Sequence, residues 1–179
     1  KIAKNRSKNK EHKLLFSNSN IQDLNLNKKF DVVVSLFHVM NYQNSDNELI
    51  KAFKVAKEHL KNDGIFIFDF WYGPAVLKDP PVTRIKRLIN DKIKVTRIAE
   101  PLTNLDEKNV DVNYDIFIED TISKKIIEKQ ESHKMRYFFD DELDLISKKV
   151  GFTFKKKYEW MSKKSPNLNS WNVVWVLKN

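Results

Sequence analysis

Cysteine is absent from this 179-residue sequence. Disulfide bonds, thiolate zinc sites, iron–sulfur clusters and cysteine nucleophiles are therefore excluded. Glycine is scarce, and its three residues, Gly64, Gly73 and Gly151, lie far apart. Neither a Walker A loop nor a G-x-G-x-x-G dinucleotide turn can be built from them. No apolar run approaches the roughly 18 residues of a membrane span, and no apolar signal-peptide core is present near the start, so we expect a soluble cytoplasmic protein without membrane association.

The composition supports a folded core together with a basic surface. The sequence is 41% hydrophobic and 12% aromatic, which favours one domain, or one domain with a modest extra sheet, over disorder. The net charge is +9, with basic clusters at residues 1–13, 155–157 and 163–164. These clusters are compatible with a nucleic-acid or anionic-lipid surface or with ordinary solvated lysines. Lysine greatly outnumbers arginine, the residue that binds phosphates bidentately, and this favours the second interpretation.

A strand, a helix and a second strand are predicted between residues 30 and 70. The β-branched run over 30–37 is typical of a strand buried on both faces. Ser45 and Glu48 have the spacing of a capping box, and apolar residues then recur at helical intervals. We expect Gly64 to adopt the left-handed conformation that closes this helix. A second apolar strand over 65–70 completes a right-handed βαβ unit with parallel strands.

The pattern changes after residue 70. Residues 71–81 are rich in aromatic residues and proline and indicate a loop. Four alternating segments then predict antiparallel strands with one solvent-exposed face, over residues 83–89, 93–99, 110–118 and 126–138. Asp140 is expected to cap a helix that ends at Gly151. Two last strands are predicted over 152–160 and 171–177.

In their order and spacing, these segments resemble the middle and end of a class I S-adenosylmethionine-dependent methyltransferase. The resemblance rests on residues 20–24, 30–37, 60–64 and the strand ending at residue 70. Residues 131–138, followed by a helix and two strands, are similar to the small enzymes that methylate amino groups of nucleotide-linked deoxysugars. The resemblance spans most of residues 14–177. It implies an α/β fold with a Rossmann-like methyltransferase sheet that lacks its first βαβ unit and carries an added antiparallel β-sheet extension.

The resemblance also implies a division of the chain. Residues 1–81 would form a partial Rossmann-like core, 82–138 an antiparallel extension on the substrate side, and 139–179 a helix and strands that complete the core sheet. The family's glycine-rich turn and the acidic residue after its second strand would lie upstream of Lys1. We therefore expect a C-terminal portion of a longer enzyme, or a split or degenerate copy, that binds the cofactor weakly or not at all. Residues 1–20 are expected to be repositioned, paired with another chain or poorly ordered.

Two short segments are expected to meet at a ligand site. In open α/β sheets the ligand lies at the carboxyl ends of the strands, which here places residues 35–42 and 69–72 at the site. Methyl transfer is an in-line displacement in which the protein aligns the reacting atoms and excludes water, and it requires no metal.

The cofactor implied by the resemblance is S-adenosyl-L-methionine. Asn20 and Ile21 stand where the family contacts adenine, and Leu36, Phe37 and His38 would contact the methionine portion. Three of them also have plain structural interpretations: Asn20 as a turn residue, Phe37 as core packing and His38 as a hydrogen-bonded structural histidine. His38 is also a candidate base, since neutral imidazole suits amine deprotonation.

The acceptor side is assigned to a second group of residues. Trp71 and Tyr72 would stack on a sugar or base, or else pin the loop as buried aromatics. Arg136 would pair with a diphosphate, or only with an acidic residue of the following helix. Tyr42 and His133 are the candidate catalytic residues. Tyr42 would orient the nucleophile, since a phenol is a poor base near neutrality.

The implied activity is methyl transfer to a small polar acceptor, an amino or hydroxyl group on a sugar that can be nucleotide-linked. Two alternatives stay open. The first is a non-catalytic, methyltransferase-like partner subunit that completes an active site supplied in trans. The second is a basic nucleic-acid-binding module, although the lysine clusters and the alternating strands do not coincide. Besides a small-molecule substrate, the expected partners are a second copy of the chain or a missing N-terminal half.

Overall fold

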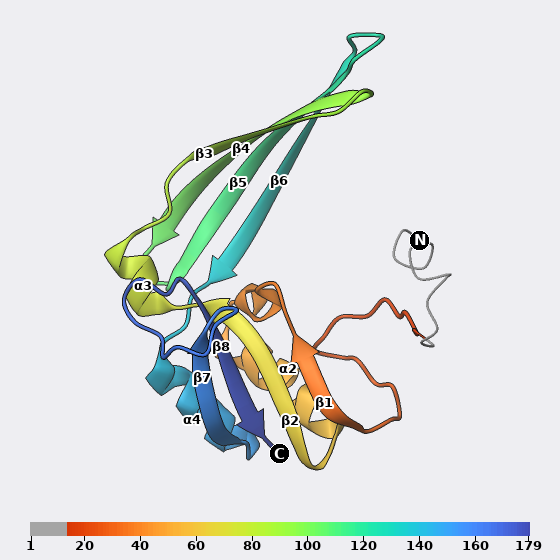
Figure 1. Cartoon of the computed structure of the whole chain (residues 1–179). Helices are drawn as coiled ribbons and strands as arrows, with labels where there is room; N and C mark the ends of the chain where they lie inside the picture. Colours follow the sequence, from red (N-terminus) through yellow and green to blue (C-terminus); the bar gives the residue numbers. More distant parts are fainter. Residues whose placement is uncertain (1–13) are drawn as a thin grey trace.

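The computed structural model describes residues 14–179 and contains two four-stranded sheets. Their strand orders are β1-β2-β8-β7 and β3-β4-β5-β6 (Figure 1). The basic cluster at residues 1–13, with the predictions made for it, lies outside the described residues. Residues 14–20 form neither helix nor strand, and their side chains are exposed. The two sheets confirm the predicted α/β fold with its antiparallel extension.

The first sheet contains the predicted parallel pair. Strand β1 (Phe30–Ser35) pairs in parallel with β2 (Leu60–Trp71), so that Val33 lies opposite Phe66. Strand β8 (Asn172–Lys178) pairs antiparallel with β2, and β7 (Thr153–Glu159) pairs antiparallel with β8. The bounds of β1, β7 and β8 agree with the prediction within two residues, whereas β2 begins five residues earlier than predicted. The last two strands complete the core sheet.

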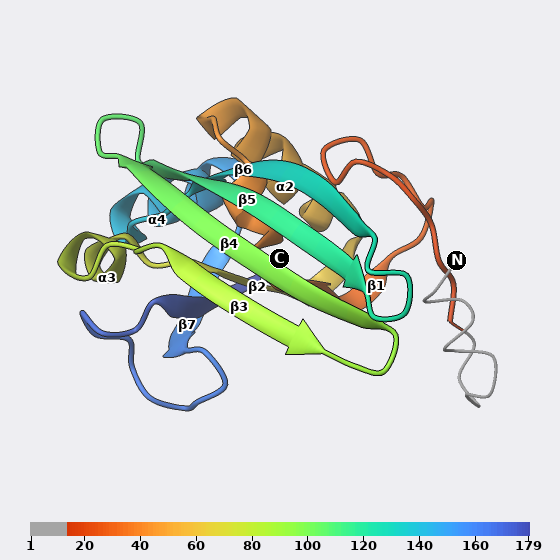
Figure 2. The ribbon, with the colours of Figure 1, turned by 90° about the horizontal axis from the view of Figure 1, so that it is seen from above.

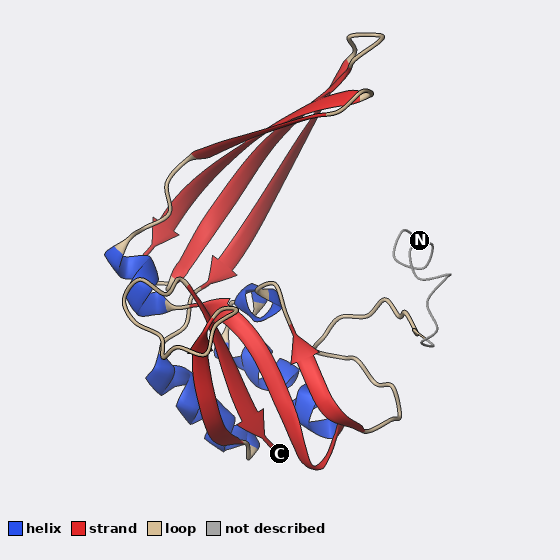
Figure 3. Ribbon diagram, viewed as in Figure 1, coloured by secondary structure: helices blue, strands red, loops and turns tan. Residues whose placement is uncertain are grey.

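Two helices pack on one face of this sheet (Figure 3). They are α2 (Asp46–Glu58) and α4 (Asp140–Val150), and their buried residues join one cluster with the apolar side chains of β2 and β8. The opposite face carries Val32, Val34 and Ile65, whose side chains are 46%, 51% and 37% exposed. The prediction of burial on both faces is therefore wrong at these three positions, although the same face is covered near the end of β2, where Asp69 is fully buried.

Helix α2 begins as predicted but ends differently. The Ser45 hydroxyl accepts a hydrogen bond from the Glu48 amide, and the Glu48 carboxylate accepts one from the Ser45 amide. The helix ends at Glu58, and the chain enters β2 directly. The left-handed residue is Asp63, with φ of 63°, so the prediction for Gly64 is wrong. Gly64 is needed for another reason: a Cβ atom there would lie 2.9 Å from the Lys61 carbonyl oxygen.

The predicted loop over residues 71–81 contains a short helix, α3 (Gly73–Lys78). The prediction read Pro74 as a loop signal, but proline is tolerated in the first turn of a helix because the amide there needs no partner. A Cβ on Gly73 would lie 2.7 Å from the Phe139 ring, so only glycine permits this close approach.

The second sheet is the predicted antiparallel meander. Its strands are β3 (Arg84–Ile89), β4 (Ile93–Asn104), β5 (Asn109–Asp120) and β6 (Ile126–Arg136). The sheet rises from the first sheet and leans over the side where β1 lies (Figures 1 and 2). At its base, Val110, Val112 and Met135 form a second apolar cluster. Val112, Tyr114 and Ile116 share the face that we call the inner face.

The C-terminal segment agrees with prediction except at one cap. The N-cap of α4 is Phe139, and Asp140 is the first helical residue, so the prediction that Asp140 caps the helix is wrong. The Asp140 carboxylate instead accepts hydrogen bonds from the Tyr72 hydroxyl and the Lys157 ammonium. Gly151 ends the helix in the left-handed conformation, with φ of 87°, as predicted.

No helix within residues 14–179 is long and apolar enough to cross a membrane. The division of the chain at residues 1–81, 82–138 and 139–179 stays a prediction.

Candidate active site

The chain makes a strained turn at the carboxyl end of β1. Phe37 and His38 both have a φ of 63°, a conformation that bulky residues rarely adopt. The buried Asp69 carboxylate at the end of β2 anchors the turn, because its Oδ1 accepts a hydrogen bond from the His38 amide at 3.1 Å. Its Oδ2 lies 2.9 Å from His38 Nδ1 without hydrogen-bond alignment, so we treat that contact as electrostatic. The turn leaves the Phe37 side chain 78% exposed.

A 3-10 turn then carries the chain toward the second sheet. This turn, η1 (Val39–Tyr42), contains the fully buried Asn41. The Asn41 side-chain amide donates to the carbonyl oxygen of Arg136 on β6 and accepts from the amide of Trp71 on β2. Asn41 therefore ties the two sheets together, and the next residue, Tyr42, reaches the inner face of the second sheet.

Tyr42 and His133 form a direct contact there. The Tyr42 hydroxyl oxygen lies 2.8 Å from His133 Nδ1, and His133 Nε2 lies 3.5 Å from a carboxylate oxygen of Glu131. Burial first, then the neighbouring Tyr114 and Glu131, raise the pKa of the Tyr42 phenol. The result is a phenol–imidazole–carboxylate chain whose phenol stays protonated at neutral pH.

This chain faces a cavity of about 310 Å³, which we call the inner cavity. Phe37, His38 and Trp71 line it on the side of the first sheet. The second sheet contributes strand residues: Arg97, Val112, Tyr114, Ile116, Glu131, His133 and Met135. A cavity of about 440 Å³, the outer cavity, adjoins it and shares Trp71, Arg97, Val112 and Tyr114. The carboxyl ends of β1 and β2 thus open onto a two-part hollow between the sheets.

Five of the predicted site residues meet at the inner cavity: Phe37, His38, Tyr42, Trp71 and His133. They come from three separate segments of the chain. The interpretation of His38 as a structural residue also has support, because its amide is held by Asp69. Phe37 is too exposed for the core-packing interpretation.

Tyr72 and Arg136 do not line the inner cavity, and their binding to a substrate stays a prediction. Trp71 and Met135, which precede them in the chain, do line this cavity. Because successive side chains along a strand alternate between faces, Tyr72 and Arg136 point away from it. Burial and the Asp140 carboxylate raise the pKa of Tyr72 to about 12. Arg136 lies 3.5 Å from Glu142 of the following helix, as its structural alternative predicted, and pairs more closely, at 2.7 Å, with Asp46 of α2, which the sequence did not predict.

Asn20, Ile21 and Leu36 line neither cavity. The Asn20 side chain accepts a hydrogen bond from the Gln22 amide, as its alternative interpretation as a turn residue predicts. Ile21 packs against the core cluster of the first sheet, and Leu36 is exposed. Their predicted contacts with a cofactor therefore stay predictions.

The sequence reasoning missed several residues that line the cavities, among them Arg84, Arg97, Tyr114, Glu131 and Trp171. Alternation along the predicted strands places Arg97 and Tyr114 on definite faces, but it does not say which face meets the first sheet. Within residues 14–179, no group of three or more histidine and acidic side chains is arranged to hold a metal ion.

Known proteins share this architecture. No family model and no curated protein sequence matches the chain. A solved S-adenosylmethionine-dependent methyltransferase from Clostridium acetobutylicum is 21% identical, with a TM-score of 0.81, over 98% of this chain and 69% of its own length. The sugar N-methyltransferase KedS8 from Streptoalloteichus is 14% identical, with a TM-score of 0.70, over 88% of this chain and 60% of its own.

A third solved structure is CalS10, an amino pentose methyltransferase from Micromonospora echinaspora with bound S-adenosylmethionine. It is 15% identical, with a TM-score of 0.68, over 89% of this chain and 62% of its own. The chain thus spans between 60% and 69% of the length of these three proteins. At these identities the likeness concerns the fold, and this chain has the fold of S-adenosylmethionine-dependent methyltransferases.

Proposed function

We propose that this chain belongs to an S-adenosylmethionine-dependent methyltransferase acting on a small polar acceptor, an amino or hydroxyl group of a sugar. The single observation that carries the proposal is the 2.8 Å contact between Tyr42 and His133 at a cavity beside the carboxyl ends of two parallel strands. A ligand cavity at that edge is the general rule for open α/β sheets. The fold it shares with sugar-methylating enzymes supports the same conclusion.

The residues after β1 fit one side of the cofactor. Phe37 presents an exposed ring beside the inner cavity, and Leu36, its neighbour in the chain, adds exposed apolar surface that suits an adenosyl group. None of the three glycines lines this cavity, and the sequence holds no glycine-rich turn to cradle the rest of the cofactor. We therefore expect weak S-adenosylmethionine binding by this chain alone, measurable by calorimetry. When bound, the cofactor supplies a methyl group activated by a sulfonium.

Tyr42 and His133 would move the proton that the acceptor releases. With the His133 proton on Nε2, the nitrogen that faces Glu131, the Tyr42 hydroxyl would donate its hydrogen bond to His133 Nδ1. As the acceptor nitrogen or oxygen bonds to the methyl carbon, its proton passes to the Tyr42 oxygen while the Tyr42 proton passes to His133. Glu131, near Nε2, stabilises the resulting imidazolium. The relay lets a phenol act without becoming a free phenolate.

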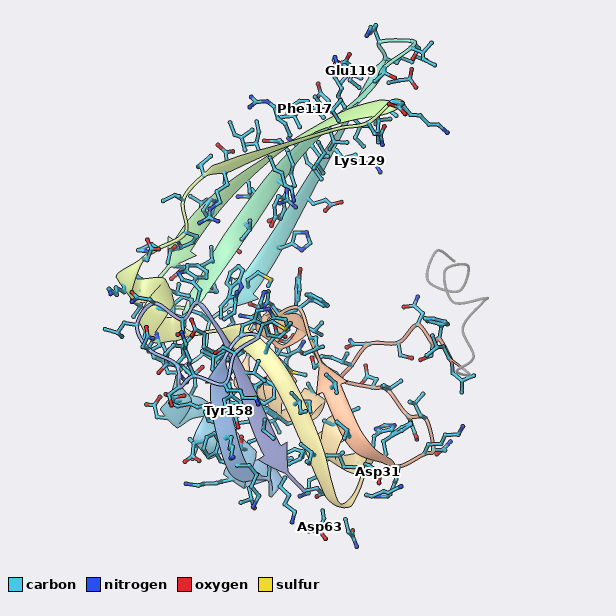
Figure 4. All side chains as sticks on the ribbon, in the orientation of Figure 1. Asp31, Asp63, Phe117, Glu119, Lys129 and Tyr158 are labelled. Atoms are coloured by element: carbon cyan, nitrogen blue, oxygen red, sulfur yellow. The ribbon has the colours of Figure 1, made fainter. Side chains whose placement is uncertain are left out.

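The test is the rate of S-adenosylhomocysteine formation at saturating S-adenosylmethionine, with amino sugars as acceptors in free and phosphorylated form. Removing the base in His133→Gln should lower the rate by about 100-fold or more, and Tyr42→Phe should lower it by about 10-fold or more. Tyr158→Phe is the matched control, because Tyr158 lies on β7 of the first sheet (Figure 4) and lines neither cavity. Wild-type rates in both cavity variants would contradict the relay.

A second candidate function is that of a partner subunit, and the uncovered face of the first sheet favours it. Strand β1 pairs only with β2 within residues 14–179, and Val32 and Val34 are about half exposed. Parallel sheets are normally buried on both faces. Sedimentation that gives a mass above 21.3 kDa for the wild type, but not for Val34→Lys, would support this candidate. A monomer that transfers methyl groups unaided would contradict it.

A further inference from the structure

The outer cavity combines aromatic walls with two arginines. The rings of Trp71 and Trp171 meet edge to face at 5.5 Å, and the Trp171 indole is fixed by donating to the Asp79 carbonyl oxygen. Arg84 and Arg97 line the cavity from β3 and β4. The guanidinium of Arg97 lies 5.0 Å from the centre of the Tyr114 ring, a cation–π contact that holds it in place.

The two arginines have no acidic partner. Within residues 14–179, no carboxylate lies at ion-pair distance from either side chain. Arg136, by contrast, has two such partners. Asp79 is the one acidic residue that lines the outer cavity, so the two guanidiniums give the cavity a net positive charge. A planar guanidinium binds carboxylate and phosphate oxygens in a bidentate geometry.

We propose that the outer cavity is a subsite for an oxyanion, a phosphate or a carboxylate, carried by the methyl acceptor. Arg97 and Arg84 bind the oxyanion, and a ring of the same molecule packs against Trp71. Arg97 and Trp71 line both cavities, so one molecule can reach Tyr42 with its reactive group and Arg97 with its charge. This assignment rests on the proposed function for the acceptor role. It gives these arginines the anion-binding role that the sequence had suggested for Arg136.

The test is calorimetric binding of glucosamine 6-phosphate, glucuronate and uncharged glucose in the absence of S-adenosylmethionine. We expect both anionic sugars to bind more tightly than glucose by about 10-fold or more, and their ranking identifies the oxyanion. Arg97→Gln should lower the affinity for the anionic sugars by about 10-fold, and Arg97→Lys should lower it less. Raising the salt concentration should weaken the binding of the anionic sugars but not that of glucose.

Arg87→Gln is the matched control. Lys86 on β3 lies opposite Arg97 on β4, so these two side chains share one face of the sheet. Arg87 is the next residue after Lys86, and its side chain therefore points to the other face. Equal affinity for glucose and the anionic sugars would overturn the subsite, and so would an equal loss in the Arg97 and Arg87 variants. Because no cofactor is needed, this result is separate from the methyl-transfer assay. Anion binding without any methyl transfer would overturn the proposed function alone, and methyl transfer indifferent to the acceptor's charge would overturn the subsite alone.

Discussion

The turn after β1 gives a quantitative test, because one buried carboxylate holds it. Asp69→Ala removes the acceptor for the His38 amide and the charge beside its imidazole. A hydrogen bond to a charged group contributes about 1.5–3 kcal/mol, and losing it leaves a part-buried amide without its partner. Two consecutive left-handed residues store about 1–3 kcal/mol each, and part of this strain is released when the anchor is lost. We therefore expect the free energy of unfolding to fall by about 1–3 kcal/mol.

The control is Asp31→Ala, which breaks an exposed, solvent-screened ion pair with Lys61 and should change the free energy of unfolding much less than Asp69→Ala does. Urea unfolding gives both values. Asp69→Asn keeps an oxygen that can accept from the His38 amide, so its free energy of unfolding should lie between those of the two alanine variants. Because the strained turn presents Phe37 and His38 to the inner cavity, Asp69→Ala should also weaken ligand binding more than Asp31→Ala does. Equal stabilities for the two alanine variants would refute the idea that Asp69 enforces the turn.

Three further predictions concern the fold. Phe53 is fully buried among the rings of Phe66, Phe68 and Phe152, so Phe53→Ala should cost about 3–5 kcal/mol in urea unfolding. Asp63 is left-handed, so thermal melts should show Asp63→Gly more stable than Asp63→Ala by about 1 kcal/mol, since only glycine adopts this backbone without strain. The hydrogen bond from Lys134 holds the pKa of Glu107 below its ordinary 4.5. That pair therefore stabilises the fold above pH 4.5 and is lost on acidification, so Glu107→Gln should show a smaller fall in stability with decreasing pH.

Local chemistry was enough to predict most elements. The β-branched run before Phe37 and the capping box at Ser45 are signals carried by neighbouring residues, and both gave the correct structure. The errors arose where tertiary packing decides. Gly73 stands in α3 because the Phe139 ring, contributed from far along the chain, leaves no room for a side chain. Asp63 carries the positive φ because β2 begins at Leu60, which pairs with Phe30, leaving no coil in which Gly64 could end the helix.

The candidate site shows the same limit more sharply. Tyr42 and His133 are 91 residues apart, and the sequence suggested each of them separately. Their contact depends on Asn41, whose buried side chain joins η1 to the base of β6. Asn41 belongs to no recognisable sequence motif, so nothing in the sequence distinguishes it from the other asparagines. Asn41 matters because its side chain bonds a backbone group of each sheet at once.

The edge at which a ligand is expected and the side chains proposed to act on it therefore come from different sheets. The parallel strands β1 and β2 provide the edge at which ligands of such folds lie. The residues proposed to handle the proton and the oxyanion, His133 and Arg97, lie on the second sheet. A change in acceptor chemistry can then be made by substitution on β4 and β6 without disturbing the core around Phe53 and Phe66. Variants at Arg97 and His133 should accordingly retain the wild-type melting temperature while losing ligand affinity or rate, and a collapse in melting temperature for either would show that the inner face is needed to hold the two sheets together.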